Sequence, residues 1–304
     1  MVYGMPYMGS KSKIAEWVIE NLPAADNLYD LFGGGGAVTD CAAQSGKWKH
    51  IIYNDIDSVI TKGFSMAIAG KFDDEKRWIS REDFFRLKDY DPYVKMCFSY
   101  SNDGRTYAYS PKNEFYKKAL HCAVFFNDIK PITKITGLDF SDVLAESTKG
   151  GRMSVIRKVL RERRLDDRLQ NYERLERLKQ LEKLQQFQSN EALQRLQRLQ
   201  RLQRLDKCKI EIFNSDYRAI NIQPNSIIYC DIPYLNTQKY TNDIDHRKFS
   251  VWCRRQVAPV YVSSYEINVP GFEVVAEIEK RVLMDIRRSK NQFKMEKLYR
   301  YRRP

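Results

Sequence analysis

Predicted strands and helices alternate over residues 1–70, and this alternation constrains the fold more than any other feature of the chain. A strand–helix–strand order predicts parallel strands, because a parallel pair needs a crossover connection that is usually a helix. After a long interval, strand signals return from residue 207 onward. The predicted helices are 14–22 and 37–43, and the predicted strands are 28–32, 51–53, 210–213, 227–230, 259–264, a closing pair at 272–276 and 280–287, and a last strand at 297–302. The sequence therefore predicts an α/β fold whose sheet is built from both ends of the chain.

A leucine-rich run occupies part of the interval between these two segments. From Tyr172 to Leu205 an apolar residue falls at every third position, except at Asn190, and the run ends as repeated Leu-Gln-Arg. Each three-residue step lags an α-helical face by about 60°, so we expect the leucines to wind around a helix. The composition predicts two helices that are separated near 189–191, where a serine or Asn190 can cap the second. A sequence expansion without selected function also explains the repeat.

The net charge of the chain restricts its partners. The 304 residues carry a formal charge of +13, and residues 149–209 hold 18 Lys and Arg against 8 Asp and Glu. This excess favours a polyanionic partner, nucleic acid before an anionic membrane surface, although a solvated helical face with internal ion pairs explains the same charges. No apolar stretch is long enough to span a bilayer and no signal peptide is evident, so we expect a cytoplasmic protein.

The cysteines and histidines predict no metal centre. Six cysteines and three histidines are scattered along the chain, and no Cys-x-x-Cys pair occurs. This pattern fits free thiols in a reducing cytoplasm. We interpret Cys230, which precedes an acidic residue, as a small apolar strand residue rather than a reactive thiol.

A glycine cluster follows the first predicted strand, in the run Asp30-Leu31-Phe32 and then Gly33 to Gly36. Glycines between a strand and a helix let a ligand approach the backbone closely, although a flexible turn explains such a run equally well. The Lys-Ser/Thr pair of a phosphate-binding loop is missing, which argues against a nucleoside triphosphatase. Asp55 ends the next predicted strand, about 20 residues further on, where an acid can bind a ribose diol or simply cap a turn. Together the two features favour a ligand that contains adenosine.

The four residues Asp231-Ile232-Pro233-Tyr234 follow the apolar strand 227–230. They place an acid, a kinked turn and an aromatic ring at the carboxyl end of a strand, where open α/β sheets bind their ligands. An aromatic amino group is a poor nucleophile, because its lone pair is delocalised into the ring. A carboxylate and a backbone carbonyl that each accept one of its N–H groups would favour tetrahedral geometry at the nitrogen, and a proline-containing turn keeps both acceptors rigid.

In this order the motifs resemble those of the Dam-type N6-adenine DNA methyltransferases, with the glycine motif first and the catalytic motif last. Residues 7–11, Tyr-Met-Gly-Ser-Lys, are similar to the aromatic-x-Gly-Gly-Lys segment of that family, and residues 213–217 to its adenine-binding segment. Residues 262–266 and 288–298 are similar to its late motifs. The resemblance implies a Rossmann-like sheet with helices on both faces, formed by a catalytic domain of residues 1–75 and 207–304. It also implies a largely helical target-recognition insert at 76–206.

The resemblance also implies the roles of particular residues, with S-adenosylmethionine as the cofactor and a flipped adenine in double-stranded DNA as the substrate. Asp231 and the Ile232 carbonyl would hold the target amino group, in a turn that Pro233 keeps rigid, and Tyr234 would stack on the flipped base. The implied cofactor-binding residues are Tyr7, Lys11, Asp30, Phe32, Gly34, Gly36, Asp55 and Asp216. The candidate DNA contacts are Asn102, Arg105 and Lys290, and no residue is assigned to a metal.

One departure from the family pattern bears on activity. The family usually has proline where this chain has Ile232, which retains the carbonyl but allows more freedom in φ. A weak or inactive enzyme that still binds cofactor and DNA is therefore one alternative, and an RNA adenine or protein glutamine methyltransferase is another. The sequence leaves the target site, a partner restriction enzyme and the oligomeric state open, with a monomer favoured and a phage origin suggested by the repetitive insert.

Overall fold

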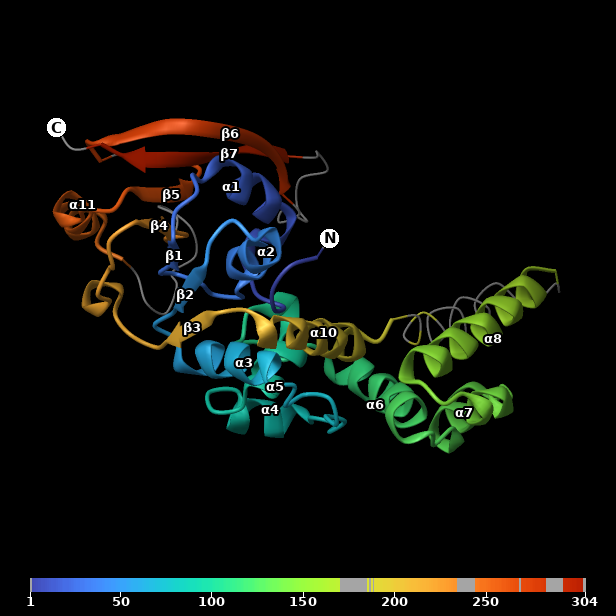
Figure 1. Ribbon diagram of the computed structural model, residues 1–304. Helices are drawn as coiled ribbons and strands as arrows, with labels where there is room; N and C mark the ends of the chain where they lie inside the picture. Colours follow the sequence, from blue (N-terminus) through green and yellow to red (C-terminus); the bar gives the residue numbers. More distant parts are fainter. Residues whose placement is uncertain are drawn as a thin grey trace. The chain divides into compact units, whose positions relative to one another are not determined.

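The computed structural model describes residues 2–169, 185, 187, 189–233, 244–267, 269–282 and 292–302 (Figure 1). The chain forms two compact units. The first unit combines Met1–Gly70 with Arg201–Pro304, and the second is Lys71–Gln200. Each unit has its own secondary structure, and the predicted active-site motifs all belong to the first.

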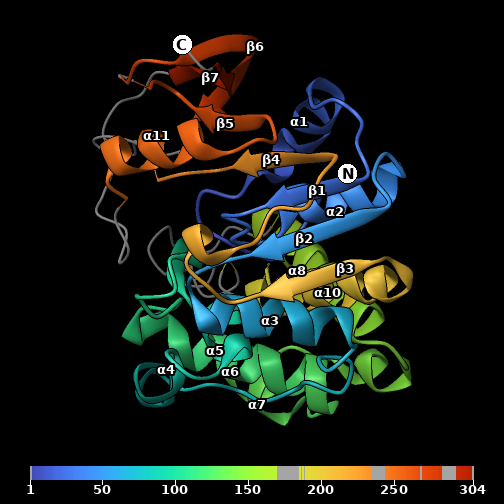
Figure 2. The ribbon, with the colours of Figure 1, turned by 60° about the vertical axis from the view of Figure 1, so that its left-hand side comes forward.

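The first unit is built on a seven-stranded sheet with the strand order β3-β2-β1-β4-β5-β7-β6. The first five strands of this order are parallel, and in Figure 2 they lie side by side. The strands are β1 (Asn27–Asp30), β2 (His50–Asn54), β3 (Ile210–Phe213), β4 (Ser226–Cys230), β5 (Val260–Ser264), β6 (Phe272–Val282) and β7 (Gln292–Tyr301). The α/β class predicted from the strand–helix alternation is confirmed.

The end of the chain differs from the predicted closing pair at 272–276 and 280–287. Residues 272–282 form the single strand β6, which pairs antiparallel with β7 from Phe272 opposite Tyr301 to Val282 opposite Gln292. The last strand also begins at Gln292 rather than at residue 297. β6 continues through the segment Glu277-Ile278-Glu279 because it is an edge strand, where charged side chains are tolerated since they face solvent.

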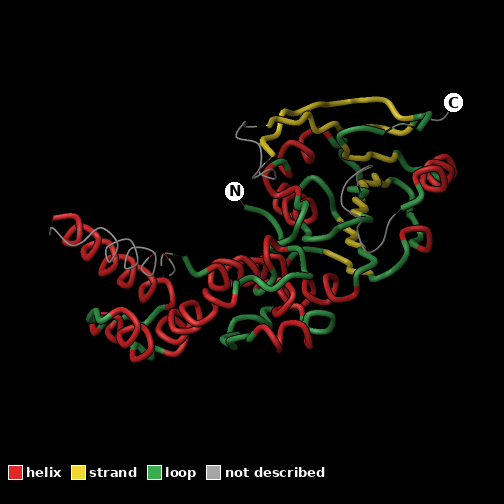
Figure 3. Tube along the Cα trace, turned by 180° about the vertical axis from the view of Figure 1, so that it is seen from behind, coloured by secondary structure: helices red, strands yellow, loops and turns green. Residues whose placement is uncertain are grey.

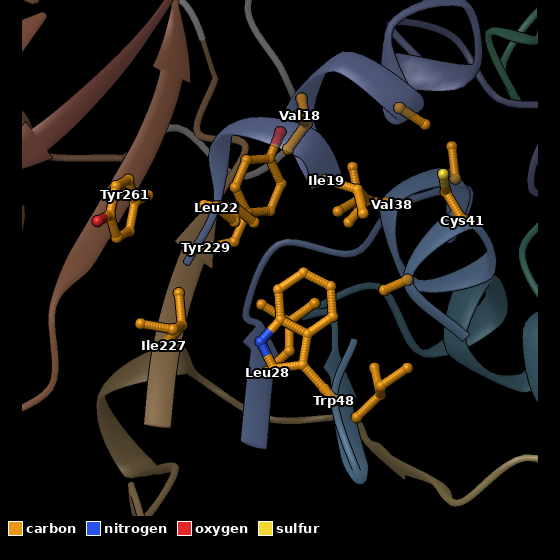
Figure 4. Close-up of a cluster of buried hydrophobic side chains, with 14 of the residues drawn as sticks. Val18, Ile19, Leu22, Leu28, Val38, Cys41, Trp48, Ile227, Tyr229 and Tyr261 are labelled. Atoms are coloured by element: carbon orange, nitrogen blue, oxygen red, sulfur yellow. The ribbon is translucent and has the colours of Figure 1, made fainter. Parts of the chain in front are cut away.

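Alternate strand residues contribute to two apolar clusters, one on each face of the sheet. Ile227 and Tyr229 of β4 belong to the first cluster, whereas Ile228 and Cys230 belong to the second. The first cluster is closed by α1 (Ala15–Asn21) and α2 (Ala37–Ser45), and Figure 4 shows Leu22, Leu28, Trp48 and Tyr229 meeting there. The second is closed by α11 (His246–Arg255), which lies across the sheet from α1 and α2 in Figure 1. Helices therefore cover both faces of the sheet. The carboxyl edge of the parallel strands is therefore formed by loops.

The remaining helical segments of the first unit are one α-helix and three short 3₁₀ helices. They are η1 (Lys11–Lys13), α3 (Ser58–Ile68), η4 (Arg201–Lys207) and η5 (Tyr217–Ala219). Asp57 begins α3, because its side chain accepts hydrogen bonds from the Val59 and Ile60 amides.

The second unit is helical in its described part, and Figure 3 draws it almost entirely as helix and loop. Ser80, Asp91 and Ser110 cap three of its helices with their side chains. An isolated bridge between Ser99 and Tyr107 is the one β pairing in the described residues of this unit. Its helices are α4 (Arg81–Leu87), α5 (Pro92–Cys97), η2 (Tyr100–Asn102), α6 (Pro111–Phe126), α7 (Lys130–Thr136), η3 (Ser141–Ala145), α8 (Lys149–Leu169) and α10 (Glu191–Gln200).

The Leu-Gln-Arg repeat changes its helical geometry along its length. The predicted break is confirmed, because α10 begins at Glu191 and Asn190 Oδ1 caps it by accepting from the Leu193 amide at 2.9 Å. The chain is an α-helix as far as Gln200 and a 3₁₀ helix from Arg201. A 3₁₀ helix has three residues per turn, so a three-residue period keeps Leu202 and Leu205 on one buried face. The prediction that the leucines wind around an α-helix missed this change. Residues 172–184, 186 and 188 of the run lie outside the described part.

Some arginines of the repeat stabilise the fold. Arg195 donates to the carbonyl oxygens of Cys97 and Ser99 at 3.0 and 2.6 Å. Arg204 donates to both carboxylate oxygens of the buried Asp40 at 2.8 Å. None of the helices in the described part of the chain combines the length and the apolar character that crossing a membrane requires.

Candidate active site

Three carboxylates gather at the carboxyl edge of the parallel sheet. Asp30 is the last residue of β1, Asp55 follows β2, and Asp231 follows β4. β1 lies between β2 and β4 in the sheet, so the three acids come from neighbouring strands. Burial raises the pKa of Asp30, and the negative charges of Asp231 and Asp55 raise it further.

Lys11 holds the carboxylate of Asp231. The ammonium of Lys11 lies 2.5 Å from Asp231 Oδ1 and 3.5 Å from Glu296 Oε1. Lys11 and Glu296 are buried, whereas the Asp231 side chain is 22% exposed and is the part of this cluster that a ligand can reach. Burial lowers the pKa of Lys11, but the charges of Asp231 and Glu296 outweigh this effect and raise the pKa well above its usual range. Lys11 is therefore a cation throughout the physiological range of pH.

Two hydroxyl groups extend this cluster along the sheet. The hydroxyls of Tyr229 and Ser263 are 2.7 Å apart, and Ser263 Oγ donates to Asp231 Oδ1 at 3.4 Å. Tyr229 and Ser263 come from β4 and β5, which are adjacent parallel strands. Asp231 is thus oriented by donors from η1 and β5.

Ile232 is directed away from the polar cluster. Its side chain is 2% exposed and belongs to the apolar cluster that contains Phe249 and Trp252 of α11. This burial restrains the backbone at the position where the family usually has proline. Pro233 is partly exposed, and Tyr234 lies outside the described residues.

Cys230, which precedes Asp231, is fully buried. Burial raises the pKa of its thiol well above the usual value, as does the charge of nearby groups. Its interpretation as a small apolar strand residue fits this environment, because a reactive thiol needs exposure and a lowered pKa.

Aromatic rings of the chain itself pack against the glycine loop. A Cβ atom at Gly33 would lie 2.2 Å from the Tyr53 ring, one at Gly34 would lie 2.8 Å from Tyr7, and one at Gly36 would lie 2.4 Å from Phe64. Gly34 and Gly36 also have φ angles of +47° and +68°, which favour glycine. Tyr7 thus lies directly on the loop that the resemblance assigns to the cofactor.

Asp55 closes the loop from the neighbouring strand. Its Oδ2 accepts the Gly34 amide at 2.8 Å, and its Oδ1 accepts the Asp57 amide at 2.8 Å. The Tyr53 hydroxyl donates to the Gly34 carbonyl at 2.8 Å. The structure therefore brings Tyr7, Gly34 and Asp55 together and leaves the Asp55 carboxylate half-buried at the sheet edge.

Asp30 and Phe32 flank the start of the loop differently. Asp30 is buried and accepts a hydrogen bond from Thr39 Oγ1 at 2.7 Å, and burial raises its pKa to about 7. Asp30 has a structural role, because its hydrogen bond with Thr39 connects the end of β1 to α2. The Phe32 ring packs 5.0 Å from that of Tyr217 and 6.1 Å from that of Phe249.

Asp216 precedes η5 at the end of the β3 connection. Its Oδ1 accepts from the Arg218 amide and from Arg218 Nε, both at 2.9 Å. The hydrogen bonds from Arg218 lower the pKa of Asp216. A ligand that uses this carboxylate would therefore share it with the Arg218 guanidinium.

Two of the candidate DNA contacts, Asn102 and Arg105, lie in the second unit, in a tight loop between Ser99 and Tyr107. Ser101 and Asn102 have φ angles of 50° and 59°, a conformation that non-glycine residues rarely adopt. Asp103 Oδ1 stabilises the turn by accepting the Arg105 and Thr106 amides at 2.8 and 2.9 Å. Arg105 is exposed and Asn102 is partly exposed, while Lys290 lies outside the described residues.

The polar groups at the sheet edge fit S-adenosylmethionine, the cofactor that the resemblance implies. A carboxylate after β2 can accept the hydroxyls of a ribose. The positive φ angles at Gly34 and Gly36 expose backbone groups of the loop that follows β1. Asp55 and the glycine loop would hold the nucleoside part, and Asp216 would contact the adenine.

Sequence reasoning missed Glu296 and Ser263 as individual site residues, although both lie in segments that resemble late family motifs. The signal for Glu296 was available, because it alternates with Leu298 along β7 and so occupies the core-facing side of a strand. A fully buried charge at such a position needs a partner.

The comparison with protein families agrees with this geometry. The family model of the D12 class N6 adenine-specific DNA methyltransferases matches residues 7–257, which span η1, the glycine loop, the second unit and β4. No curated protein matches the chain. Because the match covers most of the sequence and includes both site motifs in the expected order, the chain belongs to the D12 class N6 adenine-specific DNA methyltransferase family.

Proposed function

We propose that this protein transfers the methyl group of S-adenosylmethionine to the N6 amino group of an adenine in double-stranded DNA. The observation that carries the proposal is the position of Asp231. This carboxylate is partly exposed at the carboxyl edge of the sheet, is held by Lys11 and Ser263, and lies beside the strand that leads into the glycine loop. The family membership supports DNA adenine as the substrate.

Asp231 and the backbone after it would act on the target nitrogen. Asp231 would accept one N–H of the amino group and the Ile232 carbonyl the other, so that the nitrogen lone pair is directed at the methyl carbon. Bound S-adenosylmethionine would supply a methyl group attached to a positively charged sulfur. The sulfur is the leaving group and would keep both electrons of the broken sulfur–carbon bond. One proton of the methylated nitrogen would then leave to water, so no side chain of raised pKa is required.

The second unit would recognise the DNA. We assign this role to the insert 71–200, with the loop of Asn102 and Arg105 as its candidate contact. Tyr234, which belongs to the first unit, would stack on the flipped base. The bridge between Ser99 and Tyr107 and the Asp103 hydrogen bonds keep the loop in one conformation. A rigid loop loses less entropy when it binds, which supports such a role.

The test is transfer of labelled methyl from S-adenosylmethionine to unmethylated duplex DNA, with single-stranded DNA and RNA as parallel acceptors. Asp231→Asn keeps the shape of the side chain but removes its charge, so methyl transfer should fall at least about 100-fold. Asp26→Asn is the matched control, because Asp26 lies before β1, at the opposite end of the same sheet, and forms a surface ion pair with Lys49.

Label in N6-methyladenine of duplex DNA that is lost with Asp231→Asn and kept with Asp26→Asn would establish the proposal. Preferential labelling of RNA or of single-stranded DNA would reassign the substrate. Cofactor binding without labelling of any acceptor would refute catalysis and would leave a DNA-binding role.

A further inference from the structure

Glu296 is a buried carboxylate that reaches the active-site cluster from β7. Its side chain is 0% exposed, and Oε1 lies 3.5 Å from the Lys11 ammonium. β7 is brought to this place by its antiparallel pairing with β5, in which Ser263 lies opposite Leu298 and Ser264 opposite Lys297. Glu296 directly precedes Lys297 on β7. Lys11 thus contacts two carboxylates, that of Asp231 after β4 and that of Glu296 on β7, near the other end of the sequence.

The cost of burying Glu296 indicates a function beyond packing. A buried ion pair contributes little net stability compared with apolar residues of similar size, because desolvation offsets the attraction. Leu298, two residues further along β7, shows that this face of the strand accommodates an apolar side chain, since it is fully buried in the first cluster.

The charges of the cluster give the reason for a second carboxylate. Paired with Lys11 alone, Asp231 would form a neutral ion pair whose negative charge is largely neutralised. With Glu296 included, the two carboxylates and one ammonium have a formal net charge of −1. The target nitrogen becomes positively charged as its bond to the methyl carbon forms and stays so until a proton leaves to water. A net negative cluster stabilises that charge, whereas a neutral pair does so far less.

Two other ionisable groups near Asp231, Tyr229 and Asp30, do not supply this charge in the same way. Tyr229 is fully buried, and burial raises the pKa of its hydroxyl well above the usual value, so it is neutral. Asp30 has a pKa raised by burial to about 7 and is half protonated near neutral pH.

We propose that Glu296 is a positioning residue for methyl transfer, which acts through Lys11 to keep the Asp231 cluster negatively charged. Lys11 fixes the orientation of Asp231, and Glu296 offsets the positive charge that Lys11 brings. The inference rests on the proposed function, since it assumes that Asp231 receives the target amino group.

The test compares Glu296→Gln, which is isosteric and neutral, with Glu296→Asp, which keeps the charge on a shorter side chain. Single-turnover methyl transfer to duplex DNA should be about 10- to 100-fold slower with Gln, as is typical when a group that orients an active-site residue is removed. The KM values for DNA and cofactor should stay within about twofold, because the effect is on the transition state. The Asp variant should recover much of the rate.

Two further variants make the result specific. Glu277→Gln is the matched control, because Glu277 pairs with Lys297 at 3.3 Å on the exposed part of the same strand pair, and its rate should equal that of the wild type. In a Lys11→Met background, Glu296→Gln should cause no further loss of rate, since its effect requires the lysine.

The outcomes separate this inference from the proposed function. An inactive wild type would refute the proposed function, whereas an active wild type with an equally active Glu296→Gln variant would overturn only the role of Glu296. Equal losses with and without Lys11, or a Gln variant that does not fold, would give Glu296 a structural role and would also overturn the inference.

Discussion

The two glycines that flank α2 allow the steric requirement of the glycine loop to be measured. Gly36 precedes the helix with φ +68°, and Gly46 follows it with φ +65°. An alanine at either position adopts the same left-handed backbone, which costs about 1 kcal/mol. The two positions differ in their surroundings, because an added Cβ at Gly46 meets nothing within 4 Å, whereas at Gly36 it would lie 2.4 Å from the Phe64 ring.

Phe64 cannot move freely to make room. Its side chain is fully buried and its ring stacks on that of Tyr53 at 4.4 Å. Overpacking of this kind costs about 1–3 kcal/mol beyond the backbone strain. Gly36→Ala should therefore lower the free energy of unfolding by about 3 kcal/mol, against about 1 kcal/mol for Gly46→Ala.

Urea unfolding followed by tryptophan fluorescence measures this difference, because Trp48 is buried in the first apolar cluster of the same unit. Titration with S-adenosylmethionine provides a second measurement. Tyr53 donates to the Gly34 carbonyl, so displacement of the stacked rings should weaken cofactor binding with Gly36→Ala and leave it unchanged with Gly46→Ala. Equal losses of stability at the two positions would refute the steric argument.

Three further predictions concern buried groups of the first unit. Ile232→Ala should lower the free energy of unfolding by about 2–4 kcal/mol, whereas Ile56→Ala should change it little, because the Ile56 side chain is 51% exposed. Similar denaturation curves for the two variants would contradict the packing of Ile232. Because burial raises the pKa of Asp30 from 3.8 to about 7, its contribution to stability is fully present below pH 3.8 and is lost as the pH rises through about 7. About 3 kcal/mol of this loss falls between pH 5 and pH 8, and Asp30→Asn should remove it in unfolding measured at these two pH values. An unchanged slope would exclude a raised pKa. Arg204→Met should destabilise the protein by about 2–4 kcal/mol, because it leaves the buried carboxylate of Asp40 without the guanidinium that pairs with it. In an Asp40→Asn background the same substitution should destabilise the protein much less, and thermal unfolding measures both effects.

The parallel strands were predictable because their signals are local. Each is a short, largely apolar run, and the observed bounds differ from the predicted ones by at most two residues. The break before α10 was also local, because Asn190 interrupts the leucine period and caps the helix that follows. Such features depend on neighbouring residues, which the sequence displays directly.

The C-terminal hairpin and the 3₁₀ helix were not predictable in the same way. β6 carries Glu277 and Glu279 in a continuous strand because it lies at the edge of the sheet, and only the strand order shows which strand is at the edge. The change from α to 3₁₀ geometry at Arg201 depends on which surface the leucines cover. Both outcomes follow from tertiary packing that overrides the local pattern.

The sequence by itself determined the α/β sheet, the glycine loop and an acid at the end of a buried strand, since each follows from the order and spacing of neighbouring residues. Only the tertiary structure decided the surroundings of that acid. Lys11 is 220 residues from Asp231, and Glu296 comes from a strand whose position was not evident in the sequence. Their contact depends on strand order and on the geometry of a buried cluster, because a charge placed in the apolar interior is stable only where folding provides a partner.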